Sequence, residues 1–120
     1  MNLAIVGSTG LVGKKMLEIL EERDFPIEKI ILVASKKSEG SSIEFKGEKY
    51  RVISIETSIN EEIDVALFSA GTEVSLKWAP IFSGNGIYVI DNSSAWRMDK
   101  KVKLIIPEIN GFLLTSKDRI

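Results

Sequence analysis

The sequence predicts an α/β fold in which helices cover both faces of a doubly wound, mostly parallel sheet. Three observations predict it. Short apolar runs rich in β-branched residues alternate with segments of helical period. Several of these runs are almost wholly apolar, which is typical of parallel strands that are covered on both faces. The first strand also passes directly into a helix through a glycine-rich turn. A chain of 120 residues of this kind is one domain or a part of one.

The N-terminal part of the chain predicts a strand, a helix and a second strand. The apolar run 3–6 stops at Gly7, and a helix is expected over 11–24, ended by Pro26. A nearly all-apolar run at 29–35 is the next strand, so that a β-α-β unit closes early in the chain. The helix residues expected to face inward are Leu11, Val12, Met16, Leu17, Ile19 and Leu20.

The next part of the chain predicts a small antiparallel element and a third buried strand. Residues 43–46 and 49–54 alternate between apolar and polar around a Gly-Glu turn, which indicates a hairpin or two edge strands. Residues 56–62 give a weak signal for a turn or short helix. The apolar run 63–69 then indicates a buried strand.

The last part of the chain predicts one more helix and two further strands. Thr72 is the expected N-cap of a helix over 73–82, in which Pro80 predicts a kink or an early stop. Strands are expected over 87–91 and 102–106. The remaining segments are a polar and aromatic loop at 92–99, a turn or short helix at 107–114, and a tail at 116–120 where another strand could begin.

The composition excludes several classes of function. Sixteen Lys and Arg against 17 Asp and Glu give a net charge of −1, which offers no electrostatic footprint for nucleic acid. No apolar run is long enough to cross a bilayer, so we expect a cytoplasmic protein with no membrane partner. Cysteine and histidine are both absent, which removes disulfides, the usual nucleophile and general base, and most transition-metal ligands. No metal site is therefore expected.

The glycine turn at residues 7–13 has the spacing G-x-x-G-x-x-G. Free N–H groups and the positive end of the helix dipole point out of such a turn, and a pyrophosphate suits them. Gly7 would let the chain turn, Gly10 would let a phosphate approach the backbone, and Gly13 would let the helix pack close to the strand. The turn thus predicts a Rossmann-type dinucleotide site. The alternative is a strand-to-helix turn that binds nothing.

Four predicted strand ends carry small or polar residues. In a parallel sheet these ends lie along one edge, where ligands bind, so we expect them to converge on a single site. The four segments are 7–13, 35–38, 69–72 and 92–97.

The end of the second strand indicates which dinucleotide binds. NAD enzymes commonly place Asp or Glu there to hold the ribose 2′-hydroxyl. Here Ser35 leads into two lysines and Ser38, and no carboxylate precedes Glu39. Lys37 and the Ser38 hydroxyl suit a dianionic 2′-phosphate, so NADP is expected rather than NAD. The alternative is a solvated surface loop.

Five segments, taken in order, resemble aspartate-semialdehyde dehydrogenases. The resemblance covers nearly the whole chain but only the N-terminal, NADP-binding part of that family. N-acetyl-glutamyl-phosphate reductase shares the glycine turn but typically differs after the strand 87–91 and lacks the Pro-Glu-Ile-Asn segment, so it ranks second. The five segments are Gly-Ser-Thr-Gly-Leu-Val-Gly (7–13), Ala-Ser-Lys-Lys-Ser-Glu-Gly (34–40), Phe-Ser-Ala-Gly (68–71), Asp-Asn-Ser-Ser-Ala-Trp-Arg-Met-Asp (91–99) and Pro-Glu-Ile-Asn (107–110).

The resemblance implies a role for each matching residue. Lys37 stands where the family has an arginine for the 2′-phosphate, which keeps the charge but loses the planar fork and weakens NADP selectivity. Arg97 matches the arginine that binds the phosphate of the substrate or inorganic phosphate; the alternative is a surface arginine stacked on Trp96. The expected cofactor-binding residues are Gly7, Thr9, Gly10, Leu11, Val12, Gly13, Ser35, Lys37, Ser38, Ser69, Ala70, Gly71, Thr72 and Asn92.

The family's reaction is the NADPH-dependent reductive dephosphorylation of β-aspartyl phosphate to aspartate semialdehyde, on the pathway to lysine, threonine and methionine. A cysteine attacks the acyl phosphate, phosphate leaves, hydride reduces the thioester, and a histidine serves as acid and base. This chain has neither residue, so no catalytic residue is expected in it and the chain alone should be inactive. In the family an Asn-Cys pair follows the position of Ile120 within about ten residues.

We therefore expect residues 1–120 to be the NADP-binding domain, separated from a catalytic and dimerisation domain by truncation or proteolysis. The resemblance implies aspartyl phosphate and phosphate as small-molecule partners, and a homodimer or homotetramer for the full-length protein. Two other interpretations stay open: a non-catalytic nucleotide-binding module, and a different reductase on the same fold.

Overall fold

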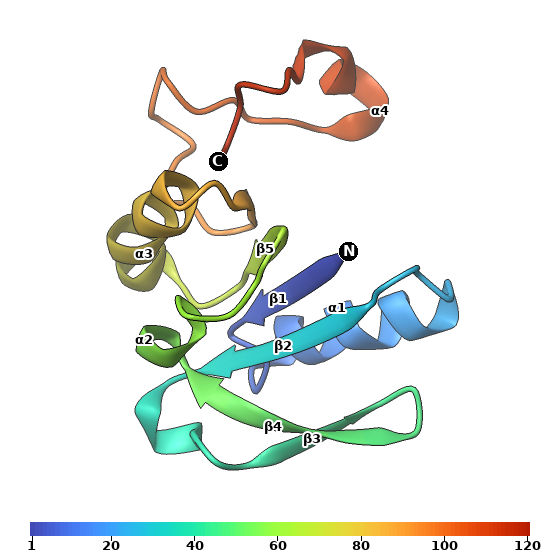
Figure 1. Cartoon of the computed structure of the whole chain (residues 1–120). Coiled ribbons are helices and arrows are strands. Elements are labelled where there is room, and N and C mark those ends of the chain that lie inside the picture. Colours follow the sequence, from blue (N-terminus) through green and yellow to red (C-terminus); the bar gives the residue numbers. More distant parts are fainter.

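A computed structural model describes residues 1–120 and contains one six-stranded sheet with helices packed against it (Figure 1). The strands are β1 (Asn2–Val6), β2 (Lys29–Ala34), β3 (Ser42–Phe45), β4 (Glu48–Ser54), β5 (Val65–Phe68) and β6 (Tyr88–Asp91). The helices are α1 (Leu11–Glu22), α2 (Ile55–Ser58), α3 (Thr72–Gly84) and α4 (Pro107–Asn110), with 3-10 turns η1 (Lys36–Ser38) and η2 (Gly111–Leu113).

The sheet grows outward in both directions from β1. Its strand order is β3-β4-β2-β1-β5-β6, and every neighbouring pair is parallel except β3 and β4, which form an antiparallel hairpin. β1 is central because its residues pair with β2 on one side and with β5 on the other. The predicted doubly wound, mostly parallel sheet and the predicted hairpin are both confirmed.

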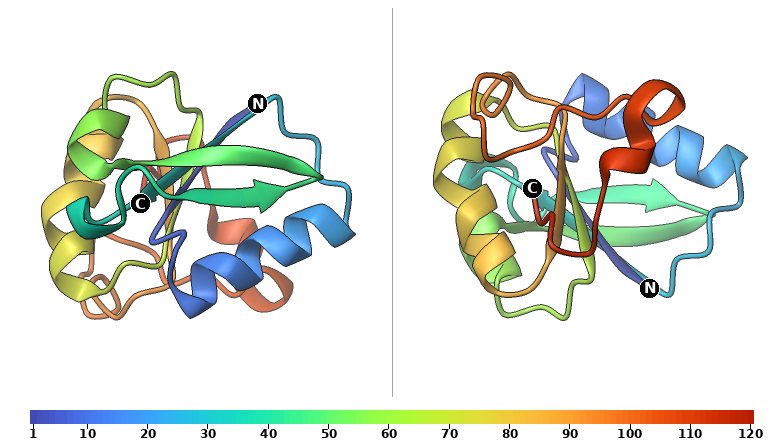
Figure 2. Two further views of the ribbon diagram at one scale, coloured as in Figure 1. Left: turned by 90° about the horizontal axis from the view of Figure 1, so that it is seen from below. Right: turned by 90° about the horizontal axis from the view of Figure 1, so that it is seen from above.

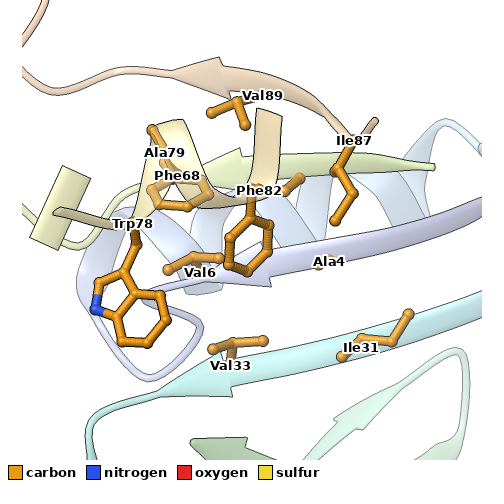
Figure 3. Packing of buried hydrophobic residues seen from close by; sticks show 11 residues of the cluster. Ala4, Val6, Ile31, Val33, Phe68, Trp78, Ala79, Phe82, Ile87 and Val89 are labelled. Carbon is orange, nitrogen blue, oxygen red and sulfur yellow. The ribbon is translucent and has the colours of Figure 1, made fainter. Parts of the chain in front are cut away.

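Alternate residues of the central strand face two separate cores. Ala4 and Val6 lie in the cluster that includes Trp78 and Phe82 of α3, while Leu3 and Ile5 lie in a second cluster. Figure 3 shows the α3 side chains pointing toward Val6 and Val33 of the sheet. The second cluster receives Leu17 of α1. Because side chains of a strand alternate between its two faces, α1 and α3 cover opposite faces of the sheet.

Helix α1 buries a narrower stripe than the sequence indicates. Gly13 and Leu17 are buried, whereas Leu11, Val12 and Ile19, which were expected to face inward, are exposed. Positions 13, 16, 17 and 20 form the inward face at helical spacing, and these three residues lie off that stripe. The helix also ends at Glu22, two residues early, and Asp24 adopts a left-handed conformation with φ of 44°.

Two further expectations about helices need correction. The early stop at Pro80 is wrong, because α3 continues through this residue to Gly84. The weak signal over 56–62 corresponds to the short helix α2, which begins and ends earlier, at Ile55 and Ser58. No helix of the protein combines the length and the apolar character that crossing a membrane requires.

The strand expected over 102–106 does not form. Lys103 instead donates through Nζ to the Leu113 carbonyl and to Asp118, which folds this part of the chain back on itself. The Val89 amide of the edge strand β6 donates to the Arg119 carbonyl at 2.8 Å, although residues 116–120 are not a strand. The whole segment after β6 lies on the side of the molecule away from the β3–β4 hairpin (Figures 1 and 2). The short helix expected near residue 107 is present as α4 and η2.

Candidate functional site: the carboxyl edge of the sheet

The four segments expected to converge do lie at one edge of the sheet, because the strands that precede them are parallel. Backbone hydrogen bonds connect them directly. The Gly7 amide donates to the Val33 carbonyl at 2.8 Å, and the Ser69 amide donates to the Val6 carbonyl at 2.8 Å. The Asn92 amide bonds the end of β5 in the same way at 3.2 Å. The loops after β1, β2, β5 and β6 are therefore neighbours.

Two glycines of the turn are required by close packing. Gly7 has φ of +95°, and a Cβ built on it would lie 2.7 Å from the Ser69 carbonyl oxygen. A Cβ on Gly13 would lie 2.2 Å from the Gly7 carbonyl oxygen. Such distances exclude a side chain at either position, so α1 and the Ser69 loop both rest directly on the turn. At Gly10 the nearest atom would be 3.3 Å away, so the space there is tight but less restricted.

The inner half of the turn uses its polar groups within the protein. The Ser8 amide and the Ser8 hydroxyl both donate to the Val33 carbonyl, at 3.0 and 3.1 Å. Ser8 is fully buried. The Gly10 amide donates to the Gly7 carbonyl at 3.0 Å, which closes the turn. These groups hold the turn on the sheet and are not available to a ligand.

The outer half of the turn leaves its amides unpaired. The N–H groups of Thr9, Leu11, Val12 and Gly13 donate to no acceptor in the protein. No side chain caps the helix at Gly10, and no acidic residue lies in its first turn. The positive end of the α1 dipole is therefore not neutralised by the protein itself. This arrangement can receive an anion such as a phosphate.

The loop after β2 presents cations and keeps its nearest carboxylate engaged elsewhere. Lys37 is exposed and its ammonium forms no ion pair, and the Ser38 amide donates to the Ser35 carbonyl at 2.9 Å. The Glu39 carboxylate accepts from the Ser54 amide at 3.3 Å and from the Ser54 hydroxyl at 3.1 Å. Glu39 is thus tied to β4, and the ammonium of Lys37 has no acidic partner.

The loop after β5 differs from expectation at its helix start. The N-cap of α3 is Gly71, with φ of 87°, and Thr72 is the first helical residue rather than the cap. The Thr72 hydroxyl is 3.1 Å from the Ser94 hydroxyl, which links this loop to the loop after β6. Ser69 donates through Oγ to the Val6 carbonyl at the end of β1, and Ala70 packs against the core cluster between the sheet and α3.

A polar network that no pattern in the sequence indicates anchors the loop after β6. The Asp91 carboxylate accepts from the Ser75 hydroxyl, from Trp96 Nε1 at 3.0 Å and from the Ser93 amide at 2.7 Å. Trp96 Nε1 also lies 2.8 Å from the Ser75 hydroxyl, and Ser75 is buried in α3. The only hint in the sequence is an acidic residue that closes an otherwise apolar strand.

Arg97 comes directly after Trp96, the last residue of this network. Its side chain is exposed, pairs with no carboxylate and does not stack on Trp96, so the alternative of a stacked surface arginine is not seen. Together with Asp91 and Ser93 it lines a cavity of about 340 Å³ between β6 and the C-terminal segment. The glycine turn at 7–13 does not line this cavity.

The sequence of this chain is similar to that of a family model and of several aspartate-semialdehyde dehydrogenases. Residues 2–116 match the family model described as semialdehyde dehydrogenase, NAD binding domain. The chain is 51% identical over 113 residues to an aspartate-semialdehyde dehydrogenase of Aquifex aeolicus, covering 90% of this chain and 32% of that protein. Aspartate-semialdehyde dehydrogenase 2 of Vibrio cholerae is 48% identical, with 91% and 32% covered. The chain thus spans about a third of the length of these relatives.

Solved structures of aspartate-semialdehyde dehydrogenases share the fold of this chain. The structure of aspartate semialdehyde dehydrogenase II from Vibrio cholerae complexed with ASA has a TM-score of 0.84 and 46% identity, over 91% of this chain and 36% of that one. An aspartate semialdehyde dehydrogenase with NADP from Candida albicans matches over 88% of this chain and 33% of that one, with a TM-score of 0.71, but at 22% identity it supports the fold alone. From the family match over residues 2–116, this chain belongs to the semialdehyde dehydrogenase NAD-binding domain family.

Proposed function

We propose that residues 1–120 form the NADP-binding domain of an aspartate-semialdehyde dehydrogenase. The reaction would be the NADPH-dependent reductive dephosphorylation of β-aspartyl phosphate to aspartate semialdehyde, in the biosynthesis of lysine, threonine and methionine. The observation that carries the proposal is the set of four unpaired amides at the start of α1, at the edge where four loops meet. The family match and the names of the relatives support it.

The pyrophosphate would bind at the outer half of the glycine turn. The amides of Leu11, Val12 and Gly13 are free and belong to the first turn of α1, so their N–H groups point away from the helix body. Two phosphate groups offer enough oxygens to satisfy all of them, and the helix dipole favours the negative charge. The missing side chain at Gly10 leaves the backbone accessible to the ligand.

The ribose 2′-phosphate would bind at the loop after β2. The Lys37 ammonium supplies the positive charge, and the Ser38 hydroxyl supplies a hydrogen bond. Glu39 does not oppose the phosphate at close range, because both Ser54 donors hold its carboxylate at β4. A lysine binds phosphate as a point charge rather than through a bidentate fork, so selectivity for NADP over NAD would be moderate.

The nicotinamide and the substrate would lie toward the loops after β5 and β6. Residues 69–72 would line the cofactor, and Asn92 would lie near its nicotinamide end. The unpaired guanidinium of Arg97 can bind two oxygens of an acyl phosphate or of inorganic phosphate through its planar fork.

NADPH supplies a hydride when it is bound. The residues of this chain would bind and orient that cofactor and hold the phosphate of the substrate. They include neither cysteine nor histidine. The proposed nucleophile and the proposed acid-base group would therefore be contributed by polypeptide outside residues 1–120, and the relatives are about three times as long.

Substitution of Leu11 tests the proposal at a single backbone atom. Leu11 is the first residue of α1, where proline is well tolerated, and Gly10 has the extended conformation that a residue before proline requires. Leu11→Pro therefore deletes one free N–H and leaves the helix intact. Leu11→Ala is the matched control, because the side chain is 87% exposed and the N–H is kept.

Isothermal titration with NADP would measure the effect. We expect Leu11→Pro to weaken NADP binding about tenfold, the usual contribution of a hydrogen bond to a charged group, and Leu11→Ala to bind as the wild type does. If a folded wild-type chain bound no NADP at millimolar concentration, the proposed function would be wrong. Equal affinities for the proline and alanine variants would overturn the assignment of the pyrophosphate to these amides.

A further inference from the structure

The loop that carries Arg97 is fixed to helix α3 by a network centred on Asp91. We propose that Asp91, acting through Ser75 and Trp96, is a positioning residue that holds Arg97 ready for phosphate. The inference rests on the proposed function, because Arg97 is a phosphate ligand only there. In this role Asp91 would touch neither the cofactor nor the substrate and would act through Arg97.

Both oxygens of the Asp91 carboxylate are used. Oδ1 accepts from the Ser93 amide at 2.7 Å. Oδ2 accepts from the Ser75 hydroxyl and from Trp96 Nε1 at 3.0 Å. The carboxylate thus joins the backbone of the loop at residue 93, the ring at residue 96 and the buried face of α3. Since Ser75 is 1% exposed, the network is fixed to the core of the protein.

The network restrains the residues on the N-terminal side of Arg97 and leaves its guanidinium free. Trp96 directly precedes Arg97 in the chain, and the Ser94 hydroxyl lies 3.1 Å from the Thr72 hydroxyl. The Ser93 hydroxyl also accepts from the Ala95 amide at 3.2 Å. A loop restrained in this way loses little freedom when phosphate binds, so a larger part of the binding energy of Arg97 is retained.

The network requires an acid and does not accept an amide. All three partners of Asp91 are donors, and an ionised carboxylate is acceptor-only. In Asp91→Asn the amide nitrogen is itself a donor, and in either orientation of the amide it would face a second donor, the Ser93 amide or Trp96 Nε1. At least one hydrogen bond is therefore lost. The substitution keeps the shape and volume of the side chain, which makes it a clean test of the hydrogen bonds.

Long-range electrostatics and a positioning role predict opposite changes in phosphate affinity for Asp91→Asn. Asp91 and Arg97 line the same cavity. Removing a negative charge near an anion site should strengthen phosphate binding if only long-range charge matters. A positioning role predicts weaker binding instead. Asp99→Asn is the matched control, because this exposed carboxylate lies two residues beyond Arg97 and accepts only from the Lys101 amide in its own turn.

The experiment is a nuclear magnetic resonance titration of the ¹⁵N-labelled chain with inorganic phosphate and, separately, with adenosine 2′,5′-bisphosphate. Phosphate reports on Arg97 through its side-chain Nε–H signal, while the bisphosphate reports on the adenosine end of the nucleotide site. For Asp91→Asn we expect the Trp96 indole signal to shift, phosphate affinity to fall about tenfold and bisphosphate affinity to stay unchanged. Asp99→Asn should bind both probes at least as well as the wild type does.

A second variant separates positioning from general damage. Trp96→Phe keeps an aromatic ring and removes the Nε1 donor. It should weaken phosphate binding about threefold, and the double variant should bind no more weakly than Asp91→Asn alone, since both changes break one network. Phosphate binding to Asp91→Asn at wild-type affinity or better would overturn the inference. The inference would also be overturned if the wild-type chain bound the bisphosphate but phosphate did not shift the Arg97 Nε–H signal. In that case the proposed nucleotide site would still hold.

Discussion

A Cβ atom on Gly13 would lie 2.2 Å from the carbonyl oxygen of Gly7. The third glycine of the turn therefore sits directly on the first, and helix α1 approaches the end of β1 as closely as its backbone permits. The free amides at the start of α1 owe their position to this contact, because the same packing fixes where the helix begins.

Gly13→Ala should destabilise the fold and displace the start of α1. The added methyl group would meet backbone atoms on a buried turn, which cannot move aside as a flexible side chain can, and overpacking of this kind costs about 3 kcal/mol. Urea unfolding would measure the loss. Gly84→Ala is the control, because a Cβ there has nothing within 4 Å and the glycine ends α3. If both variants were equally stable, the close contact at Gly13 would have no energetic consequence.

Lys37→Ala should weaken the binding of NADP more than the binding of NAD. The two nucleotides differ only in the 2′-phosphate, and the loss of one charge-assisted bond to it corresponds to about tenfold in affinity. Isothermal titration with both nucleotides would provide the comparison. Lys49→Ala removes an exposed lysine on β4 and should change neither affinity. Equal losses for NADP and NAD in Lys37→Ala would refute the assignment of the 2′-phosphate to this residue.

Ser8→Ala should lower stability without affecting the nucleotide. The Ser8 hydroxyl lies within the glycine turn, but it is fully buried and donates to the Val33 carbonyl at 3.1 Å. Loss of that bond costs about 1 kcal/mol. Chemical denaturation together with NADP titration would separate the two effects. A large loss of NADP affinity in a well-folded Ser8→Ala chain would mean that the hydroxyl turns toward the ligand.

The sequence predicted most of what positions the candidate site, because the signals there are local. An apolar run that contains β-branched residues ends at Gly7, and a helix pattern begins four residues later, so strand, turn and helix follow from neighbouring residues. The sequence assigns Gly13 to close helix packing, and the structure confirms that role, because a Cβ there would lie only 2.2 Å from the Gly7 carbonyl oxygen. The convergence of four loops followed from parallel strands alone.

The remaining features depend on contacts between distant residues. Residues 102–106 have the composition of a strand, but β6 pairs at its free edge only with the backbone of Arg119, and the run stays irregular. The exposure of Leu11 and Val12 depends on which stripe of α1 meets the sheet, and two adjacent apolar residues do not reveal it. The anchor between Asp91 and Ser75 joins residues 16 apart on different elements, so no local pattern signals it.

Asp118 should titrate well below an ordinary aspartate and make the C-terminal segment sensitive to acid. The Lys103 ammonium, 2.8 Å from Oδ2, together with the Thr115 amide and hydroxyl, lowers the pKa of Asp118 from 3.8 to about 2. Since the pKa of the folded state lies below that of the unfolded chain, the stabilisation is fully present above pH 3.8 and is lost as the pH falls toward 2. Carboxyl ¹³C shifts would give the pKa, and amide exchange over 114–118 should speed up in the same interval. In Lys103→Met the pKa of Asp118 should return toward 3.8, whereas Lys101→Met should leave it unchanged. An Asp118 that titrates near 3.8 in the wild-type chain would show that the ion pair does not persist in solution.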